Sequence, residues 1–295
     1  MKMKSVFSAT FWAACSMGMI GGNAYAADSD ESFLNKVQAQ AGIAAQLPAA
    51  IRDKGSITIV MTTSSPPGHF TTSHGMDGLD KDVGLALAKA LGLKADIVGV
   101  PLDQVIPGIQ AHRYDVVISQ FKPTPERAKV LDFVDYAQSG TALGTLAGNP
   151  SKLSADDLCG FRIGVQKGSS QAVGQIPEFS KACTDAGRKP IVESDFVDST
   201  TSLLALRSHR IDGVLIDSPV MGYAAKQSPE VMTVGGPISA NPVGIGSLKD
   251  SNLAKPIQAA LQYLHTSGAY GEIFKKWGME EDEISNFQIN DVQSN

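Results

Sequence analysis

The chain has 295 residues, a length that suits one large domain or two lobes of ~100–150 residues each. Its hydrophobic share of 43% and its charged share of 19% are those of a globular protein with a real core, which excludes disordered, collagen-like and coiled-coil classes. The formal net charge of −5 argues against a nucleic acid or an anionic membrane surface as the partner.

The first 26 residues have the pattern of a cleaved export signal. Two lysines are followed by an apolar stretch over residues 6–20 and by Ala-Tyr-Ala at residues 24–26, a small-x-small cleavage site. The apolar stretch is shorter than the ~20 residues that a membrane-spanning helix needs. We therefore expect a signal peptide at 1–26 and a periplasmic mature protein of net charge −7. A lipoprotein acylated at Cys15 is the alternative.

Export also changes how the cysteines are interpreted. Loss of the signal leaves Cys159 and Cys183, and an even number of cysteines in an oxidising compartment favours a disulfide between them. Such a cross-link would contribute ~3 kcal/mol to stability in the chain-entropy model. Two free buried thiols are the alternative.

The mature chain begins with apolar residues close to helical spacing. This spacing predicts one amphipathic helix over residues 31–53, ended by Gly55, within an N-terminal helical extension at 27–54. The apolar positions are Phe33, Val37, Ile43, Leu47 and Ile51.

Short β-branched segments then alternate with helical patterns. Residues 56–61 predict the first strand, and the Ser, Pro, Gly, His and Thr residues that follow predict a loop through Gly78. Further strands are expected at 94–100, 114–119, 161–166, 190–196 and 213–217, and helices from Asp80 to about Leu91 and at 102–110, 169–186, 199–208, 253–268 and 270–277. Strands that alternate with helices imply an α/β fold with mostly parallel sheets flanked by helices.

Two extended, Gly-rich segments separate the strand sets, at residues 138–150 and 235–246. They indicate that the chain leaves one lobe, builds a second and returns, so that the pair would act as a two-segment hinge. One continuous sheet with two loops is the alternative.

The motifs of the common enzyme classes are absent from the sequence, including Gly-x-Ser-x-Gly, the phosphate loop, His-Glu-x-x-His and Cys-x-x-Cys. His69, His74 and Asp77 lack the spacing of metal ligands, so a solvated loop is the favoured interpretation. Asp80 and Asp82 are interpreted as charges at a helix start rather than as a calcium site. We expect no catalytic residues, no metal and no cofactor.

Polar residues instead follow the predicted strands, at residues 119–120, at 166–170 and at Asp217. In open α/β sheets, ligands bind beyond the carboxyl ends of the strands. The Gly-Ser-Ser segment at 168–170 opens a helix, where free backbone N–H groups favour an anion. Simple capping by Ser169 explains the same residues almost as well.

Two charged residues could hold a zwitterion between the lobes. Arg127 follows a strand after a short turn, and its planar guanidinium suits a carboxylate, although an exposed arginine in a turn is the alternative. Asp217 ends an apolar strand, so it needs either a protein cation or a ligand ammonium. This pair would suit an amino acid.

A set of short motifs runs through the mature chain from about Leu47 onward. The motifs are Leu47-Pro48-x-x-Ile51-x-x-x-Gly55, Pro66-Pro67, Gly78-Leu79-Asp80-x-Asp82, Ile106-Pro107-x-Ile109, Tyr114-Asp115, Thr124-Pro125-Glu126-Arg127-Ala128, Asp132-Phe133, Gly164-Val165-Gln166-x-Gly168-Ser169, Asp212-Gly213-Val214, Asp217-Ser218-Pro219, Gly268-x-Tyr270 and Lys276-Trp277-Gly278. In these motifs the chain resembles the family 3 solute-binding proteins of ABC importers, the polar amino-acid-binding group. The two mature cysteines, with residues 134–136 and 223–227, further resemble a subgroup that contains mimosine-binding proteins.

The resemblance implies a two-lobed type II periplasmic binding fold, with lobe I at residues 55–139 and 241–295 and lobe II at 140–240. It also implies the extracytoplasmic substrate-binding component of an ABC importer. Such a protein captures a polar amino acid or a related small carboxylate and delivers it to the membrane permease. A monomer is expected.

The resemblance also places ligand contacts. It puts the carboxylate-binding arginine at Arg127 and the ammonium-binding aspartate at Asp217. The other implied contacts are Ser119, Gln120 and Lys122 in the first lobe and Gly168, Ser169 and Ser170 in the second.

Three positions depart from the family pattern. Ser65 and Leu102 stand where the family usually has aromatic rings, so the stacking shelf is reduced, and Phe70 and Phe121 are the candidates to replace it. Lys122 stands where a small Ser or Thr is common. It either favours a ligand more negative than a simple zwitterion or points to solvent along its stem.

Two rival functions remain open at this point. One is an exported enzyme that resembles cyclohexadienyl dehydratase on the same fold, with Asp217 as the acid that can be placed in its cleft. The other is a ligand-sensing accessory protein whose closed form docks on a receptor.

Overall fold

The computed structural model describes residues 31–291. The predicted signal peptide at 1–26 and the alternative lipidation site at Cys15 lie outside the described residues. Within residues 31–291, no helix combines the length and the apolar composition that crossing a bilayer requires.

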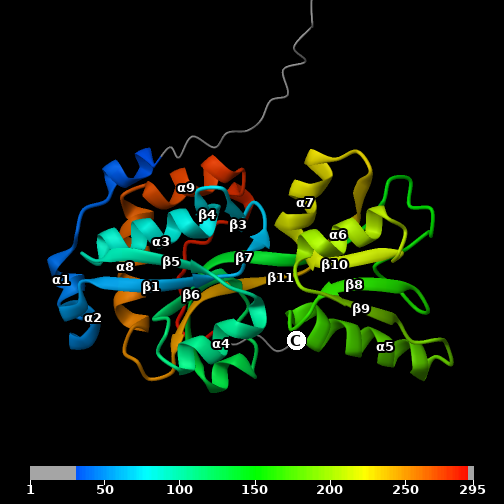
Figure 1. Cartoon of the computed structure of the whole chain (residues 1–295), viewed down its shortest axis with the longest axis horizontal. Helices are drawn as coiled ribbons and strands as arrows, with labels where there is room; N and C mark the ends of the chain where they lie inside the picture. Colours follow the sequence, from blue (N-terminus) through cyan, green and yellow to red (C-terminus); the bar gives the residue numbers. More distant parts are fainter. Residues whose placement is uncertain (1–30, 292–295) are drawn as a thin grey trace, which may run out of the picture. The chain divides into compact units, whose positions relative to one another are not determined.

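One eight-stranded sheet extends through both lobes, in the order β5-β1-β6-β11-β7-β10-β8-β9 (Figure 1). The strands β5, β1 and β6 run parallel at one end, and β10, β8 and β9 run parallel at the other. Their bounds are β1 Ser56–Met61, β5 Lys94–Gly99, β6 Val116–Phe121, β7 Leu131–Leu146, β8 Arg162–Gln166, β9 Val192–Phe196, β10 Gly213–Asp217 and β11 Val231–Leu248. The predicted α/β class with two mostly parallel strand sets is confirmed.

The long strands β7 and β11 join the two strand sets. They pair antiparallel with each other, while β11 also pairs with β6 and β7 also pairs with β10. Register shifts interrupt the ribbon between Val234 and Asn241. The two predicted crossing segments are therefore the halves of one antiparallel ribbon, and the sheet is continuous through it. The sequence had indicated extended chain at these places, but not their pairing.

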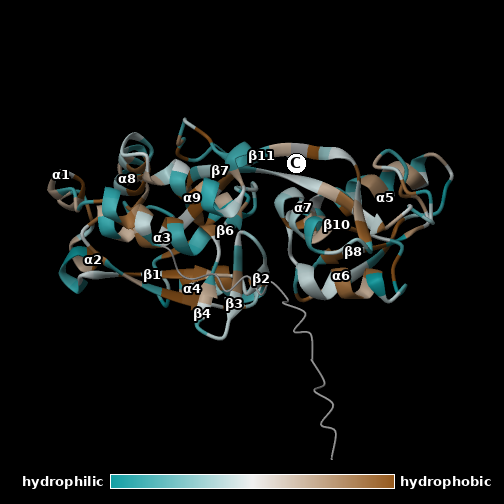
Figure 2. Ribbon diagram, turned by 90° about the horizontal axis from the view of Figure 1, so that it is seen from above, coloured by the Kyte–Doolittle hydropathy of each residue, from teal (hydrophilic) through white to brown (hydrophobic). Residues whose placement is uncertain are grey.

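Helices cover both faces of the sheet in each lobe (Figures 1 and 2). The first lobe carries α3 Leu79–Ala90, α4 Leu102–Gln110, α8 Ala254–Thr266 and α9 Ala269–Trp277, and the second carries α5 Ile176–Asp185, α6 Ser199–Arg207 and α7 Ser218–Gln227. Successive side chains of a strand point to opposite faces of the sheet, so each strand packs against helices on both sides. Along β1, Ile57 and Ile59 pack with α3, α8 and α9, whereas Val60 packs with α4 on the other face. Along β10, Val214 packs with α6 and α7, whereas Leu215 packs with α5.

The single helix predicted over residues 31–53 is wrong. The segment forms a 3₁₀ helix Ser32–Lys36 and two short helices, α1 Ala41–Ala44 and α2 Ala49–Lys54. Pro48 begins the last piece as its N-cap, because proline has no N–H to continue an earlier helix. The apolar positions Phe33, Val37 and Leu47 are nevertheless buried against the first-lobe core. The pattern thus identified the buried side chains but not the backbone conformation.

Two further segments differ from their predictions. Residues 62–78, expected as a loop, contain a small antiparallel sheet of β2 Ser64–Ser65, β3 His69–Thr72 and β4 Gly75–Asp77, whose strands are too short for visible alternation. The helix predicted at 169–186 begins with a π turn at Gln171–Gln175 before α5. Pro177 accounts for this turn, because it cannot donate the α-helical hydrogen bond to the residue four positions before it.

The predicted disulfide between Cys159 and Cys183 is present, with a Cα–Cα distance of 5.6 Å. It joins the segment before β8 to α5 across a sequence separation of 24 residues. The cross-link therefore ties the outermost helix of the second lobe to the sheet beneath it.

Replacing both cysteines with alanine should lower the free energy of unfolding by ~3 kcal/mol, because the unfolded chain regains the entropy of the open loop. Urea denaturation followed by circular dichroism measures this loss. The wild type under reducing conditions should lose a similar amount, which separates the cross-link from the change of side chain. An unchanged denaturation midpoint in both samples would contradict the prediction.

Asp135 is a buried acidic residue in the first lobe. The residue lies on β7 and is 1% exposed, and neither of its carboxylate oxygens has a hydrogen-bond partner among the described residues. Burial, and to a smaller extent the nearby Asp291, raises the pKa of Asp135 to about 7. The folded protein therefore holds a proton that the unfolded chain releases at lower pH.

This raised pKa makes stability fall as the pH rises from about 4 to about 7, because the folded state binds more protons than the unfolded state over that interval. Asp135→Asn keeps the shape and removes the charge. It should raise the melting temperature at pH 8 and have little effect near pH 4. Differential scanning calorimetry across this range tests it, with the exposed Asp53→Asn as the control. Parallel stability curves for Asp135→Asn and wild type would refute the prediction.

Candidate ligand-binding site

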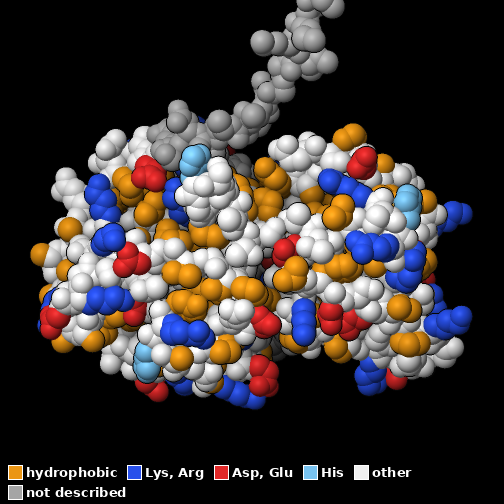
Figure 3. Space-filling view, in the orientation of Figure 1, with side chains coloured by type: hydrophobic (Ala, Val, Ile, Leu, Met, Phe, Trp, Pro, Cys, Tyr) orange, Lys and Arg blue, Asp and Glu red, His pale blue; other side chains and the backbone are white. Residues whose placement is uncertain are grey.

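A cleft lies between the two lobes, at the carboxyl ends of β6, β8 and β10 (Figure 3). About 380 Å³ in and in front of the cleft, open solvent included, is free of protein atoms. The lining residues are Thr62, Ser65, His69, Leu102, Ser119, Gln120, Phe121, Lys122, Arg127, Gln166, Ser169, Ser170, Gln171 and Asp217.

The structure brings the predicted contact residues together in this cleft. All of them except Gly168 line it, and Gly168 contributes its carbonyl oxygen to Arg127 at the cleft edge. Their role in holding a ligand stays a prediction. Sequence reasoning placed Gln166 among the polar residues at the strand ends, but it did not select Thr62, His69 or Gln171 as contacts.

Arg127 enters the cleft from a 3₁₀ turn, Arg127–Lys129, that follows β6. Its guanidinium carbon lies 3.8 Å from the ring centroid of Phe121. Nη1 donates to the carbonyl oxygen of Lys122 at 3.1 Å, and Nη2 donates to that of Gly168 in the second lobe at 3.2 Å. The exposed-arginine alternative is therefore wrong.

Burial lowers the pKa of Arg127 to about 10, while the charge of Asp217 acts to raise it. Arg127 thus keeps its charge at neutral pH. A guanidinium has five N–H donors, so two bonds to carbonyl oxygens leave donors for an anion.

Asp217 faces the same cleft from the end of β10, at the start of α7. Its Oδ1 accepts a hydrogen bond from Gln171 Nε2 at 2.8 Å and lies 3.7 Å from Lys122 Nζ. Lys122 is 11% exposed and also reaches Thr141 Oγ1 on β7 at 3.5 Å. Of the two interpretations of Lys122, the one that pointed it to solvent is wrong. Among the described residues, the ion-pair partner of Asp217 is Lys122 rather than Arg127.

A buried hydrogen-bond network supports the first-lobe wall of the cleft. His69 is 3% exposed; its Nε2 contacts Thr62 Oγ1 at 2.6 Å and Ser119 Oγ at 3.0 Å, and its Nδ1 contacts Asp80 Oδ2 at 2.6 Å. The interpretation of His69 as part of a solvated loop is therefore wrong, although His74 in the same segment is exposed. Asp80 lies in the first turn of α3 as expected, but it is fully buried.

The same network reaches the ribbon of β7 and β11 through Tyr136 on β7. The Tyr136 hydroxyl donates to Asp80 Oδ1 at 2.6 Å and accepts from the Gln120 backbone N–H at 2.9 Å. This second bond holds Gln120 at a φ of 46°, in the left-handed region. Contacts with residues of α3 and β7 thus help β6 to fix the positions of Ser119 and Gln120.

The carboxamide of Gln120 is buried but not satisfied. The residue is 5% exposed, and neither Oε1 nor Nε2 has a hydrogen-bond partner among the described residues. It packs directly on Gly68, where an added Cβ would stand 2.2 Å from Gln120 Nε2. A side chain at position 68 would therefore displace this amide from its place in the cleft wall.

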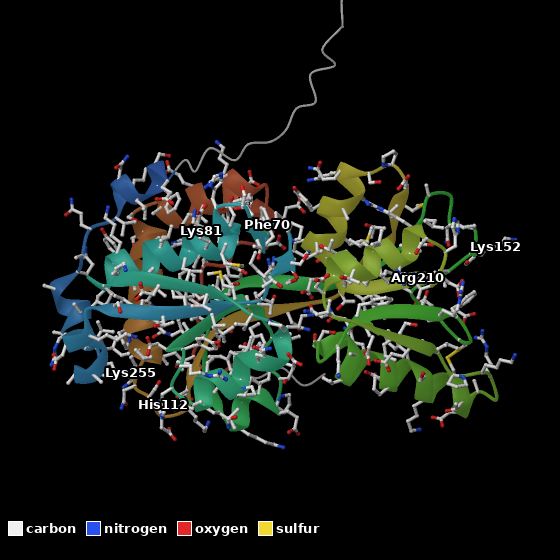
Figure 4. All side chains as sticks on the ribbon, in the orientation of Figure 1. Phe70, Lys81, His112, Lys152, Arg210 and Lys255 are labelled. Atoms are coloured by element: carbon white, nitrogen blue, oxygen red, sulfur yellow. A yellow bond between two sulfur atoms is a disulfide. The ribbon has the colours of Figure 1, made fainter. Side chains whose placement is uncertain are left out.

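The two candidate replacement rings have different positions. Phe121 lines the cleft, but its face is covered by the Arg127 guanidinium. Phe70 packs edge-on against Trp277 at a centroid distance of 6.0 Å and is not among the residues that line the cleft (Figure 4). Phe70 is thus not the replacement, and Ser65 and Leu102 leave this wall without a free aromatic face.

The two lobes touch across the cleft. Besides the contact of Arg127 with Gly168 and of Lys122 with Asp217, Ser64 Oγ donates to Thr200 Oγ1 at 2.6 Å. Ser64 lies on β2 and Thr200 lies in the first turn of α6. The structure therefore shows a conformation in which the cleft walls are in contact.

Comparisons with known proteins agree with this geometry. The model of the family described as bacterial extracellular solute-binding proteins, family 3, matches residues 57–280. The arginine-binding protein ArgT of Corynebacterium glutamicum is 28% identical over 255 residues, which cover 86% of this chain and 84% of that protein. All of these matches include both lobes.

Solved structures are also similar to this chain over most of its length. An ancestral arginine-binding protein bound to arginine is 33% identical, with a TM-score of 0.68 over 76% of this chain and 98% of that one. The ancestral amino acid-binding protein AncCDT-1, a precursor of cyclohexadienyl dehydratase, is 27% identical, with a TM-score of 0.67 over 77% of this chain and 97% of that one. These neighbours have the type II periplasmic binding fold.

His69→Phe should lower the free energy of unfolding by ~3 kcal/mol, because it leaves the buried Asp80 carboxylate without one of its partners. Urea denaturation measures this loss. His74→Phe, in the same segment but exposed, is the matched control and should unfold like the wild type. Equal stabilities of the two variants would show that the His69 network does not support the cleft wall.

Proposed function

Because the chain belongs to family 3 of the bacterial extracellular solute-binding proteins, we propose that it captures an amino acid between its two lobes and delivers it to an ABC importer. The observation that carries this proposal is the placement of Arg127 and Asp217. They come from different lobes, line one cleft and are not paired with each other. The amino-acid-binding relatives support the same ligand class.

Each end of an amino acid finds a complementary group. The free N–H donors of Arg127 would hold the α-carboxylate, helped by Ser169 and Ser170 at the start of the helical segment that follows β8. Both close contacts of Asp217 fall on Oδ1, which leaves Oδ2 for the ligand ammonium. Ligand binding would thus connect the two lobes.

The ribbon of β7 and β11 would act as the hinge between lobe I, at 55–139 and 241–295, and lobe II, at 140–240. Two features support this. The hydrophobic cores of the two lobes are separate clusters, and the ribbon register is irregular between Val234 and Asn241. A ligand that contacts both lobes favours the closed state by its differential affinity.

We further propose that the mature protein is a periplasmic monomer, released by cleavage after residue 26, and that its partner is the membrane permease. No covalent chemistry is needed. Asp217 accepts a hydrogen bond from Gln171 in this cleft, and ammonium binding would account for its position. Release of phenylpyruvate from prephenate by the purified protein would overturn this part and favour the dehydratase alternative.

Arg127→Ala should weaken amino-acid binding roughly a hundredfold, because charge-assisted hydrogen bonds to a carboxylate are worth ~3 kcal/mol. Isothermal titration calorimetry against a panel of amino acids measures the loss. Arg52→Ala removes the same side chain far from the cleft, on α2, and should bind like wild type. Undiminished affinity in the Arg127→Ala variant would contradict the proposed clamp.

A further inference from the structure

The cationic side chains that line the cleft outnumber the anionic ones. Apart from His69, the titratable side chains among the lining residues are Lys122, Arg127 and Asp217, two cations and one anion. Lys122 is 11% exposed and Asp217 is 29% exposed, so their charges are largely withdrawn from water. Asp80 is not part of this balance, because it lies behind His69 and both of its oxygens are bonded to His69 and Tyr136.

A closed cleft with two cations and one anion carries one positive charge in excess. A buried charge without a counter-ion is costly, so the bound ligand has to supply a negative charge for closure to be favourable. A simple zwitterion leaves the excess unchanged, and a cationic amino acid increases it. A ligand of net charge −1 removes it.

We propose that the cleft selects an acidic amino acid, whose second carboxylate binds Lys122 Nζ. This rests on the proposed function, since Arg127 holds the α-carboxylate and Asp217 holds the ammonium. Gln120 lies two residues before Lys122 and lines the same cleft, and its buried Nε2 donor, packed on Gly68, has no partner among the described residues, so it would serve as a second partner for the same carboxylate by turning away from Gly68. The selection differs from that of the relatives named for arginine, a cation.

Titration calorimetry of the mature protein, refolded to remove any bound ligand, tests the selection. The compounds are L-glutamate and L-glutamine, L-aspartate and L-asparagine, L-arginine, and glutarate. In at least one of the two pairs the acid should bind ~10–100-fold more tightly than its amide, the usual worth of a hydrogen bond between charged groups. Arginine should bind most weakly of the amino acids.

Lys122→Met keeps the length of the side chain and removes its charge. It should remove the preference for the acid, so that the acid and its amide bind this variant with equal affinity. Lys167→Met is the matched control, because Lys167 is exposed next to the cleft but does not line it, and the preference for the acid should persist. The wild-type series decides the question by itself if Lys122→Met does not fold.

The outcomes separate this inference from the proposed function. Amides or arginine bound as tightly as the acids would overturn the charge selection and support amino-acid binding. Glutarate bound in the absence of any amino-acid binding would support the charge selection and overturn the proposed ligand class. No binding by any of the compounds would overturn both.

Discussion

The structure depends on keeping Arg127 and Asp217 in one cleft without pairing them with each other. Arg127 uses two donors on backbone carbonyl oxygens and rests on the Phe121 ring, so its position does not require Asp217. Asp217 is held in turn by Gln171. Arg127 and Asp217 are thus each oriented by neutral groups, and Asp217 in addition by Lys122, an arrangement that the proposed ligand site would require.

Much of this site could be predicted from the sequence because strand ends converge in space. The apolar pattern of residues 213–217 marks β10 and places Asp217 at its carboxyl end, and residues 119–122 lie at the carboxyl end of β6 in the same way. His69 could not be recognised by such reasoning. Its burial depends on Asp80 and Ser119, which are 11 and 50 residues away in sequence, and no local periodicity reports these contacts.

In the fold as well, local sequence patterns predicted some elements, whereas contacts between residues distant in sequence decided others. The strand at residues 56–61 and the helix at 102–110 were predicted with their observed bounds, because alternation and helical spacing report burial directly. The segment at 31–53 has helical spacing but is broken at Pro48, since contacts with the first-lobe core decide its conformation. The pairing of β7 with β11 joins residues about 100 positions apart, which composition does not encode.

In the proposed function, Lys122 would connect the charge of the cleft with closure of the two lobes. Lys122 follows β6 in the first lobe and Asp217 ends β10 in the second, so their contact holds the two lobes together when the cleft is closed. A ligand shifts the equilibrium between open and closed states only by interactions stronger than those it replaces. A ligand ammonium on Oδ2 of Asp217 would leave Lys122 with only its contact to Oδ1, and would bring no new partner to Lys122. In the proposed function, a ligand that also brings a carboxylate to Lys122 would satisfy both partners of that contact. Lys122, which adds a cation to the cleft, would then also set the free energy that closure gains from the correct ligand.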